Sequence, residues 1–164
     1  MGDGLLEDLQ REIGAGRVIA VIGAGVSIGA TNNKPVASWQ GLLHHGVDRC
    51  SRELKDLTGV DEKWARRVHE EIDSGDLDDV LAAAEKIARK LGAPKGGEYS
   101  RWLRETIGKL QAERRDVLEA LSALNVALAT TNYGGLIEEV ARLPAVTWMD
   151  GAKVKIGELG AGGG

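Results

Sequence analysis

The sequence predicts an α/β fold with a parallel sheet, because two apolar runs of strand length frame a long helical segment. The runs cover residues 18–22 and 126–129, and each ends abruptly in small or polar residues. In an open parallel sheet, ligands sit just beyond the carboxyl ends of the strands. If the two strands are neighbours, residues 23–27 and 130–133 therefore face one crevice. A crevice of this kind suits a nucleotide.

The elements outside the helical segment follow from apolar periodicity and turn residues. A first amphipathic helix, closed by Gly14 and Gly16, precedes a strand over about residues 17–22. Residues 31–35 have the composition of a loop. After the second strand, a helix is expected around residues 136–140. Short strands at residues 145–148 and 153–156 come next, and then a Gly-rich tail over 157–164 that should be disordered.

Residues 38 to about 123 are expected to form helices inserted between the two strands. The first helix is expected to begin at the cap residue Ser38, the second at Asp61 and the third at the acidic residues from Asp76. The third helix should end at Gly92 and Pro94. Apolar stripes at residues 99–110 and 117–124 predict two more helices. Stripes of this spacing favour core packing. The helical segment would form one wall of the crevice.

The turn after the first strand has the chemistry of a phosphate cradle. Gly23 and Gly25 carry no Cβ, which allows positive φ and lets backbone N–H groups approach a phosphate. A helix that opens near Val26 would direct its positive end at a pyrophosphate, and Ser27 would add a hydroxyl. The alternative is a tight strand-to-helix turn without a ligand, because a lone glycine pair is a weak signal.

Departures from common nucleotide-binding patterns narrow the choice. The dinucleotide fingerprint G-x-G-x-x-G is broken, because Ile28 stands where the third glycine belongs and Gly29 comes one place late. Asp48 lies at a plausible distance for a ribose-binding acid, but a helical pattern leads into it rather than a strand. An ordinary dehydrogenase is therefore disfavoured. No G-K-[ST] follows a glycine loop, which excludes an ATP or GTP P-loop.

Three segments together resemble the NAD-binding core of the sirtuin-like family, in the branch common among prokaryotic NAD-consuming defence proteins. They are Gly-Ala-Gly-Val-Ser at 23–27, Ser-Trp-Gln-Gly-Leu-Leu at 38–43 and Thr-Thr-Asn-Tyr at 130–133. Their order and spacing agree with the family over about residues 15–150. The resemblance implies a Rossmann-like partial parallel sheet with a large helical insertion, and NAD as ligand or substrate. It assigns cofactor binding to Gly23, Ala24, Gly25, Val26, Ser27, Trp39, Thr130, Thr131, Asn132 and Tyr133.

The resemblance makes Asn132 the catalytic residue, which positions a ribose hydroxyl or a water beside the glycosidic bond of NAD. The bond to nicotinamide breaks through an oxocarbenium-like state, so positioning and electrostatic support matter more than a strong nucleophile. An asparagine side chain both donates and accepts hydrogen bonds, which suits this task. The alternative is that Asn132 only ends the strand or caps the next helix.

Two departures from the family pattern bear on catalysis. Gly134 and Gly135 follow Tyr133, where the family has an aspartate. The family's acid/base histidine lies downstream of the Thr-Thr-Asn-Tyr segment, and no histidine follows His69 here. His44, His45 and His69 do not match that position, and we expect them to be structural or solvent-facing. Adjacent His44 and His45 cannot share one helix face.

We therefore expect residues 1–156 to form a single, incomplete domain of the family, truncated or frame-disrupted at its C-terminus. The function expected for the complete form is cleavage of NAD at the nicotinamide–ribose bond. The alternatives are a non-catalytic module that binds NAD or ADP-ribose and a fragment without independent function. A partial sheet leaves an edge unpaired, so a homo-oligomer or a partner chain would cover it.

Composition bounds the remaining choices. The chain has 164 residues and a net charge of −4, which argues against a nucleic-acid-binding surface. Cys50 is the single cysteine, so no internal disulfide and no cysteine-based zinc ribbon can form; no metal is expected, as in the zinc-free branch. The N-terminus has no signal-peptide pattern, and the longest apolar run is too short for a membrane span. We expect a cytoplasmic protein without a membrane partner.

Overall fold

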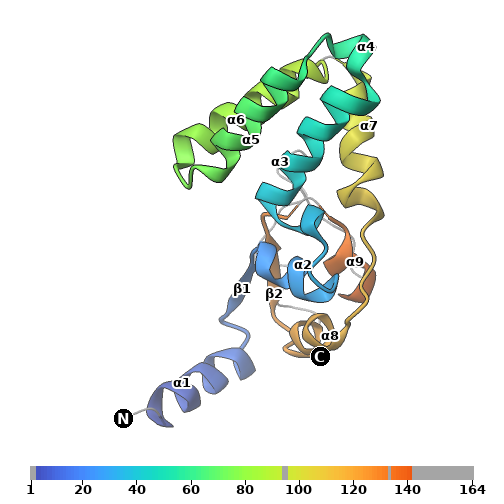
Figure 1. Cartoon of the computed structure of the whole chain (residues 1–164). Coiled ribbons are helices and arrows are strands. Elements are labelled where there is room, and N and C mark those ends of the chain that lie inside the picture. Colours follow the sequence, from blue (N-terminus) through green and yellow to red (C-terminus); the bar gives the residue numbers. More distant parts are fainter. Residues whose placement is uncertain (1–2, 94–95, 133, 142–164) are drawn as a thin grey trace.

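The computed structural model of the chain describes residues 3–93, 96–132 and 134–141. Within those ranges the fold is mostly helical with a small parallel sheet, which places it in the α/β class (Figure 1). The strands and tail expected beyond residue 144 lie outside the described residues, and so does Tyr133. No helix in the described ranges combines the length and the apolar character that crossing a membrane requires.

The two predicted strands are side by side, as the sequence indicated. Strand β1 spans Ile19–Ile22 and pairs in parallel with β2, Ala127–Thr130, so that Ile19 lies opposite Ala127 and Ile22 opposite Thr130. Both strands therefore end at the same edge of the sheet. Residues 23–27 and 131–132, which follow the two strands, lie together at that edge.

Three short helices flank the sheet. Helix α2, Ala24–Ala30, follows β1 directly, α8, Asp116–Ala123, leads into β2, and α9, Leu136–Ala141, comes after it. Helix α8 packs between α2 and α9. The buried residues of this region form a small core of Ala30, Leu118 and Leu136.

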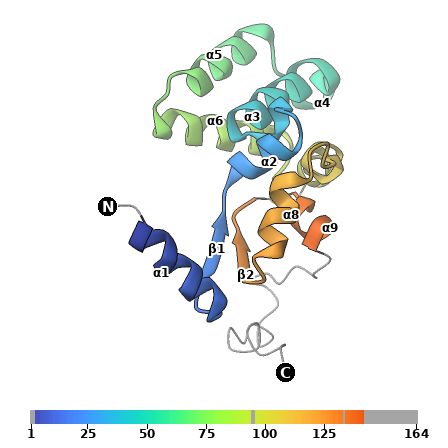
Figure 2. The same cartoon turned by 90° about the horizontal axis from the view of Figure 1, so that it is seen from below.

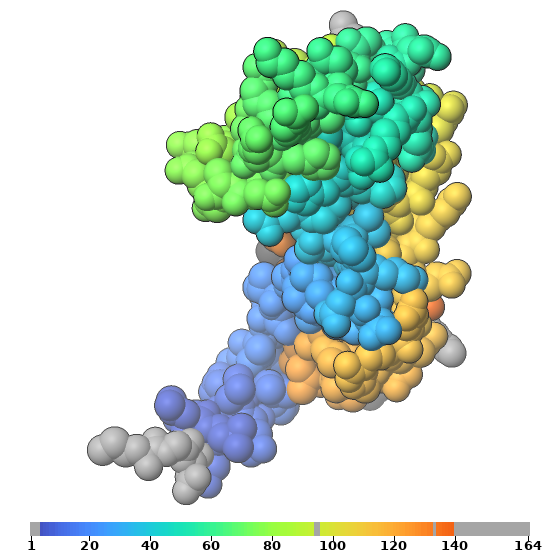
Figure 3. Space-filling model, viewed as in Figure 1, coloured from blue at the N-terminus to red at the C-terminus, as the bar shows by residue number. Residues whose placement is uncertain are grey.

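The other face of β1 is bare among the residues that the structure describes. Ile22 is buried, but Ile19 and Val21 are 56% and 76% exposed. Helix α1, Asp3–Gly14, precedes β1 and lies apart from the other described helices (Figure 2). The leucine stripe that predicted this helix is exposed as well, and Figure 3 shows α1 protruding. The sheet and α1 thus present an uncovered apolar surface.

The helical segment between the strands forms a separate layer. Its elements are α3 (Trp39–Asp48), a π turn (Arg49–Glu53), α4 (Lys55–Thr58), α5 (Glu62–Asp73), α6 (Leu77–Lys90) and α7 (Gly97–Glu105). The predicted caps are confirmed: Ser38 Oγ accepts from Gly41 N at 3.0 Å, Asp61 Oδ1 from Trp64 N at 2.7 Å, and Asp76 Oδ1 from Asp78 N at 2.8 Å. The apolar stripes meet in a core of thirteen residues, counted over the described part of the chain.

The apolar stripe expected at residues 99–110 does not form one continuous helix. Helix α7 ends at Glu105, where the Thr106 hydroxyl donates to the Trp102 carbonyl oxygen at 2.7 Å. A 3-10 turn, Ile107–Lys109, follows. A threonine that bonds back to the preceding turn competes with the helical ladder. The break turns residues 107–110 toward the sheet.

Candidate functional site

The turn after β1 differs from the expected phosphate cradle in its backbone. Gly23 is the N-cap of α2 with φ −100°, and Gly25 lies inside the helix and is absent from the glycines with positive φ. Neither glycine uses the positive φ that its lack of a Cβ allows. A Cβ added at Gly23 or Gly25 would meet no atom within 4 Å. Packing of the described chain does not require glycine at either position, and the turn is open to approach from outside.

The carboxyl ends of the two strands are joined by hydrogen bonds that we call the strand-end clasp, made by Thr130 and Asn132 with Ile22, Gly23 and Ser27. Asn132 Nδ2 donates to the Gly23 carbonyl oxygen at 3.0 Å and to Ser27 Oγ at 3.0 Å. The Asn132 backbone N–H donates to Thr130 Oγ1 at 3.0 Å, and Thr130 Oγ1 donates to the Ile22 carbonyl oxygen at 3.2 Å. The clasp holds the β1–α2 turn against the end of β2.

The clasp fixes which polar atoms remain for a ligand. A carbonyl oxygen only accepts, so the amide nitrogen of Asn132 must face Gly23 and its Oδ1 must face elsewhere. In the ranges the structure describes, Asn132 Oδ1 accepts no hydrogen bond, and the hydroxyl proton of Ser27 has no acceptor. Of the clasp atoms in the described chain, Asn132 Oδ1 is therefore the acceptor and the Ser27 hydroxyl the donor left for a ligand.

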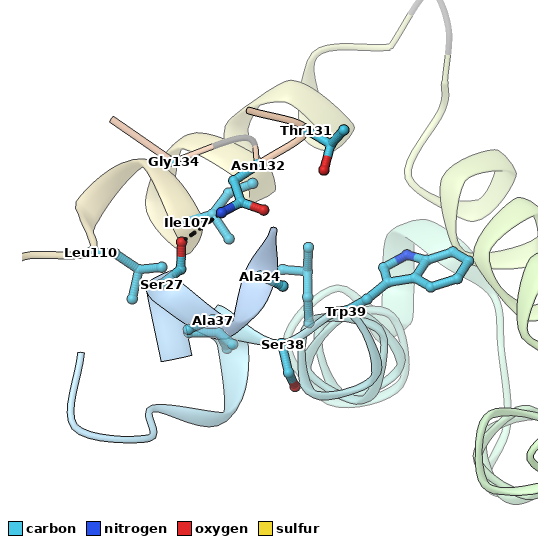
Figure 4. A pocket seen from close by; sticks show the side chains of 12 residues that line it. Ala24, Ser27, Ala37, Ser38, Trp39, Ile107, Leu110, Thr131, Asn132 and Gly134 are labelled. Atoms are coloured by element: carbon cyan, nitrogen blue, oxygen red, sulfur yellow. Dashed lines mark hydrogen bonds between the residues drawn. The ribbon is translucent and has the colours of Figure 1, made fainter. Parts of the chain in front are cut away.

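These atoms face a cavity of about 320 Å³ between the sheet edge and the helical layer (Figure 4). The described residues that line it are Ala24, Ser27, Val36, Ala37, Ser38, Trp39, Leu42, Ile107, Leu110, Thr131, Asn132 and Gly134. Most of these side chains are apolar, and none of them titrates. The volume is at the lower end of the range for ligand sites, and an apolar wall with a few convergent polar groups is typical of them.

The predicted cofactor-binding residues take different places. Five of them line the cavity: Ala24, Ser27, Trp39, Thr131 and Asn132. Gly23 gives its carbonyl oxygen to Asn132, and the Thr130 hydroxyl is used inside the clasp. Gly25 and Val26 lie on α2 outside the lining, and Val26 packs on the small core. Tyr133 is outside the described residues. The Trp39 indole points away from Asn132 (Figure 4).

Several lining residues were not found by sequence reasoning. Val36 and Ala37 belong to a 3-10 turn, Pro35–Ala37, just before the Ser-Trp segment, and their position next to that segment is the one signal that pointed to them. Ile107 and Leu110 were assigned to a core stripe, which is confirmed because Ile107 is buried in the helical core and Leu110 packs against it, but both also line the cavity. They reach the cavity because α7 breaks at Thr106, a change of direction that periodicity does not show.

The histidines form contacts away from the cavity, and none of them lines it. His45 Nδ1 accepts from Trp102 Nε1 at 3.0 Å, whereas His44 Nδ1 lies 2.7 Å from His69 Nδ1, so the adjacent histidines use different helix faces, as predicted. The fold supplies a carboxylate that is remote in sequence, because His44 Nε2 lies 3.0 Å from Asp73 Oδ1. Burial and the charge of His44 lower the pKa of His69.

Within the described ranges, no group of three or more His, Cys, Asp or Glu side chains is placed to hold a metal ion. Comparisons of the chain with protein-family models, curated proteins and solved structures found no match. The argument for function therefore depends on the geometry of the cavity and its clasp.

Proposed function

We propose that this chain binds NAD at the strand-end cavity and cleaves it at the nicotinamide–ribose bond, as the sirtuin-like resemblance implies. One observation carries the proposal: the fold brings Ser27 from the first strand end and Asn132 from the second to one apolar cavity. The Rossmann-like character of the sheet and a cytoplasmic location belong to the same proposal.

The polarity of the site matches the parts of a dinucleotide. The Ser27 hydroxyl has a proton to donate, and phosphate oxygens accept hydrogen bonds. Asn132 Oδ1 accepts, which suits a ribose hydroxyl or a water. The side chains of Val36, Leu42 and Ile107 offer an apolar wall for an aromatic ring. The cavity would take one nucleoside portion, with the remainder of the dinucleotide along the open glycine turn.

The chemistry does not require a titratable group among the described residues that line the cavity. The ring nitrogen of nicotinamide in NAD is cationic, so it takes the bonding electron pair and leaves as a neutral molecule without a general acid. Water then adds to the ribose carbon and releases a proton, and the products are ADP-ribose and nicotinamide. The protein's task is to hold the sugar and the water in line, which is the task assigned to Asn132.

The second candidate is a non-catalytic module that binds NAD or ADP-ribose. The absence of a titratable side chain among the described lining residues favours it, because no group there would take the proton of the attacking water. Both candidates use the same cavity, and they differ in turnover.

The sequence expectation of a second copy or a partner chain at the sheet edge also remains a proposal. Its support is that the sheet of the described residues has two strands, which leaves the outer edge of each unpaired. The side chains of Ile19 and Val21 on β1 are also 56% and 76% exposed. Covering this surface would remove it from water without altering the cavity.

The test compares the wild-type chain with Asn132→Ala by calorimetric titration with NAD and ADP-ribose and by nicotinamide release. We expect the variant to lose turnover. Its free energy of unfolding should fall by about 1–3 kcal/mol, because the side chain makes two hydrogen bonds worth roughly 0.5–1.5 kcal/mol each. Gln10→Ala is the control, since it removes an exposed side-chain amide on α1, remote from the cavity.

The outcomes separate the candidates. Binding with turnover that Asn132→Ala abolishes supports the hydrolase. Binding of NAD or ADP-ribose without turnover in the wild type supports the module. A wild-type chain that binds neither compound refutes both, and unchanged turnover in Asn132→Ala removes the role assigned to this residue.

A further inference from the structure

We infer that Thr130 is a positioning residue, whose hydroxyl fixes the orientation of Asn132 and so the direction of the acceptor that the cavity presents. The inference rests on the proposed function only where its test measures NAD turnover or NAD binding. The resemblance placed Thr130 among the residues that contact the cofactor. The geometry gives it another task, because Thr130 does not line the cavity and its hydroxyl is engaged with the protein itself.

The Thr130 hydroxyl has one proton, and its two contacts use the group in opposite senses. The proton goes to the carbonyl oxygen of Ile22 at 3.2 Å, which leaves a lone pair to accept the backbone N–H of Asn132 at 3.0 Å. Ile22 and Thr130 are opposite each other in the strand register. One hydroxyl therefore links the last residue of β1 to the backbone of Asn132.

The side-chain contacts of Asn132 depend on this link, because the link holds the Asn132 backbone. The backbone of Asn132 must be held in place for its Nδ2 to reach both Gly23 O and Ser27 Oγ, each at 3.0 Å. With both amide protons committed, Oδ1 has one direction. A group that is oriented before the ligand arrives loses less entropy on binding, and reaction rates are sensitive to errors in position of about 1 Å.

A purely structural threonine would behave differently. Threonine is common in strands because its branched Cβ suits the pleated backbone. Thr130→Val keeps the branched shape and removes the hydroxyl, whereas Thr130→Ser keeps the hydroxyl and removes the methyl group. A strand-forming role predicts that valine is tolerated and serine is harmful. A positioning role predicts the reverse.

The experiment uses the full chain in the wild-type, Thr130→Val and Thr130→Ser forms. The first readout needs no ligand: the side-chain amide signals of Asn132 in a nitrogen-15 correlation spectrum. We expect Thr130→Val to move them toward the positions of a free amide and Thr130→Ser to leave them near the wild-type positions. Displaced signals in Thr130→Ser overturn the inference, even if the valine variant does not fold.

The second readout is the kinetics of nicotinamide release, or the affinity for NAD if the wild type only binds. We expect Thr130→Val to lower kcat, or the affinity, by about tenfold, the effect of losing one well-placed hydrogen bond. The change in KM should be smaller, and Thr130→Ser should restore the rate. Wild-type spectra and rates in a folded Thr130→Val chain overturn the inference. A wild-type chain that ignores NAD refutes the proposed function alone, and the spectra still test Thr130.

Discussion

The helical layer is held together mainly by buried apolar side chains, whereas the sheet region depends more on hydrogen bonds. The helical layer buries thirteen residues in one core, whereas the sheet region has a core of three in the described chain. Ile72 and Ile87 in the helical layer are fully buried, but Val21 on β1 is 76% exposed. The sheet region depends more on polar contacts, above all those of Asn132.

This difference means that most of the folding stability comes from the helical layer, whereas the candidate site is held mainly by the sheet region. Burial of a large apolar side chain contributes about 1.5–3 kcal/mol, and a hydrogen bond contributes about 0.5–1.5 kcal/mol net. The helical layer should therefore dominate the free energy of unfolding. The sheet region, with few buried contacts, is the part expected to open first and to gain most from a ligand.

The largest effect should come from removing the aromatic side chain at the centre of the helical layer. Trp102 is 2% exposed, and its indole N–H donates to His45 Nδ1 at 3.0 Å. We expect Trp102→Ala to lower the free energy of unfolding in urea by about 3–5 kcal/mol. Leu81→Ala is the control, because this side chain is 48% exposed and its loss should cost no more than about 0.5 kcal/mol. Equal losses of stability in the two variants would contradict the conclusion that the buried core of the helical layer dominates the free energy of unfolding.

A smaller effect is expected at Gly41, which lies where the two regions meet. A Cβ at Gly41 would overlap the Pro35 carbonyl and lie 2.9 Å from Ser38 Oγ. The 3-10 turn that begins at Pro35 carries cavity residues, so Gly41→Ala must push the cavity wall aside. We expect a loss of about 1–3 kcal/mol in stability and a reduced rise of Tm on addition of NAD.

Gly29→Ala is the matched control for this prediction. It places a methyl group on α2, where a Cβ meets no atom within 4 Å. Alanine favours a helix over glycine by about 1 kcal/mol, so this variant should be as stable as the wild type or more so. If NAD raises the Tm of both variants equally, Gly41 does not support the cavity.

The sequence predicted what local signals determine. The pairing of the strands, the caps at Ser38, Asp61 and Asp76, and the arrival of Ser27 and Asn132 at one edge follow from periodicity, turn chemistry and the geometry of parallel sheets. Each cap lies beside the helix that it begins, and the meeting of Ser27 with Asn132 follows once the two strands pair in parallel.

The exact start of α2, the break after α7 and the contacts between helices were not predictable from one sequence. The β1–α2 turn keeps φ negative at Gly23 because α2 begins at once, at Ala24. The presence of Ile107 in the cavity depends on the break at Thr106. His44 and His69 are 25 positions apart and meet because α3 packs on α5. No spacing rule within a single helix reveals such a pair.

That histidine pair gives the smallest predicted effect, and it concerns the helical layer. His44 and His69 are stacked with ring centroids 4.9 Å apart, and their Nδ1 atoms are 2.7 Å apart, so one ring must donate a proton and the other must accept it. If both rings were protonated, both Nδ1 atoms would carry a proton and the two N–H groups would repel each other. Burial is the main cause that lowers the pKa of His69, and His44 and Arg52 lower it further, against the opposing effect of Asp48 and Asp73.

Because the pKa of His69 is lower in the folded chain than in the unfolded chain, the unfolded chain binds more protons as the pH falls through about 6.5. The stabilising contribution of neutral His69 is complete above that pH and declines below it. We expect the free energy of unfolding in urea to fall from pH 7.5 to 5.5, and to fall less in His69→Gln, which cannot take up the proton. The difference between the two slopes measures the contribution of this pair. Parallel slopes would mean that the helical layer tolerates a proton on His69, and that this pair contributes nothing to the pH dependence of its stability.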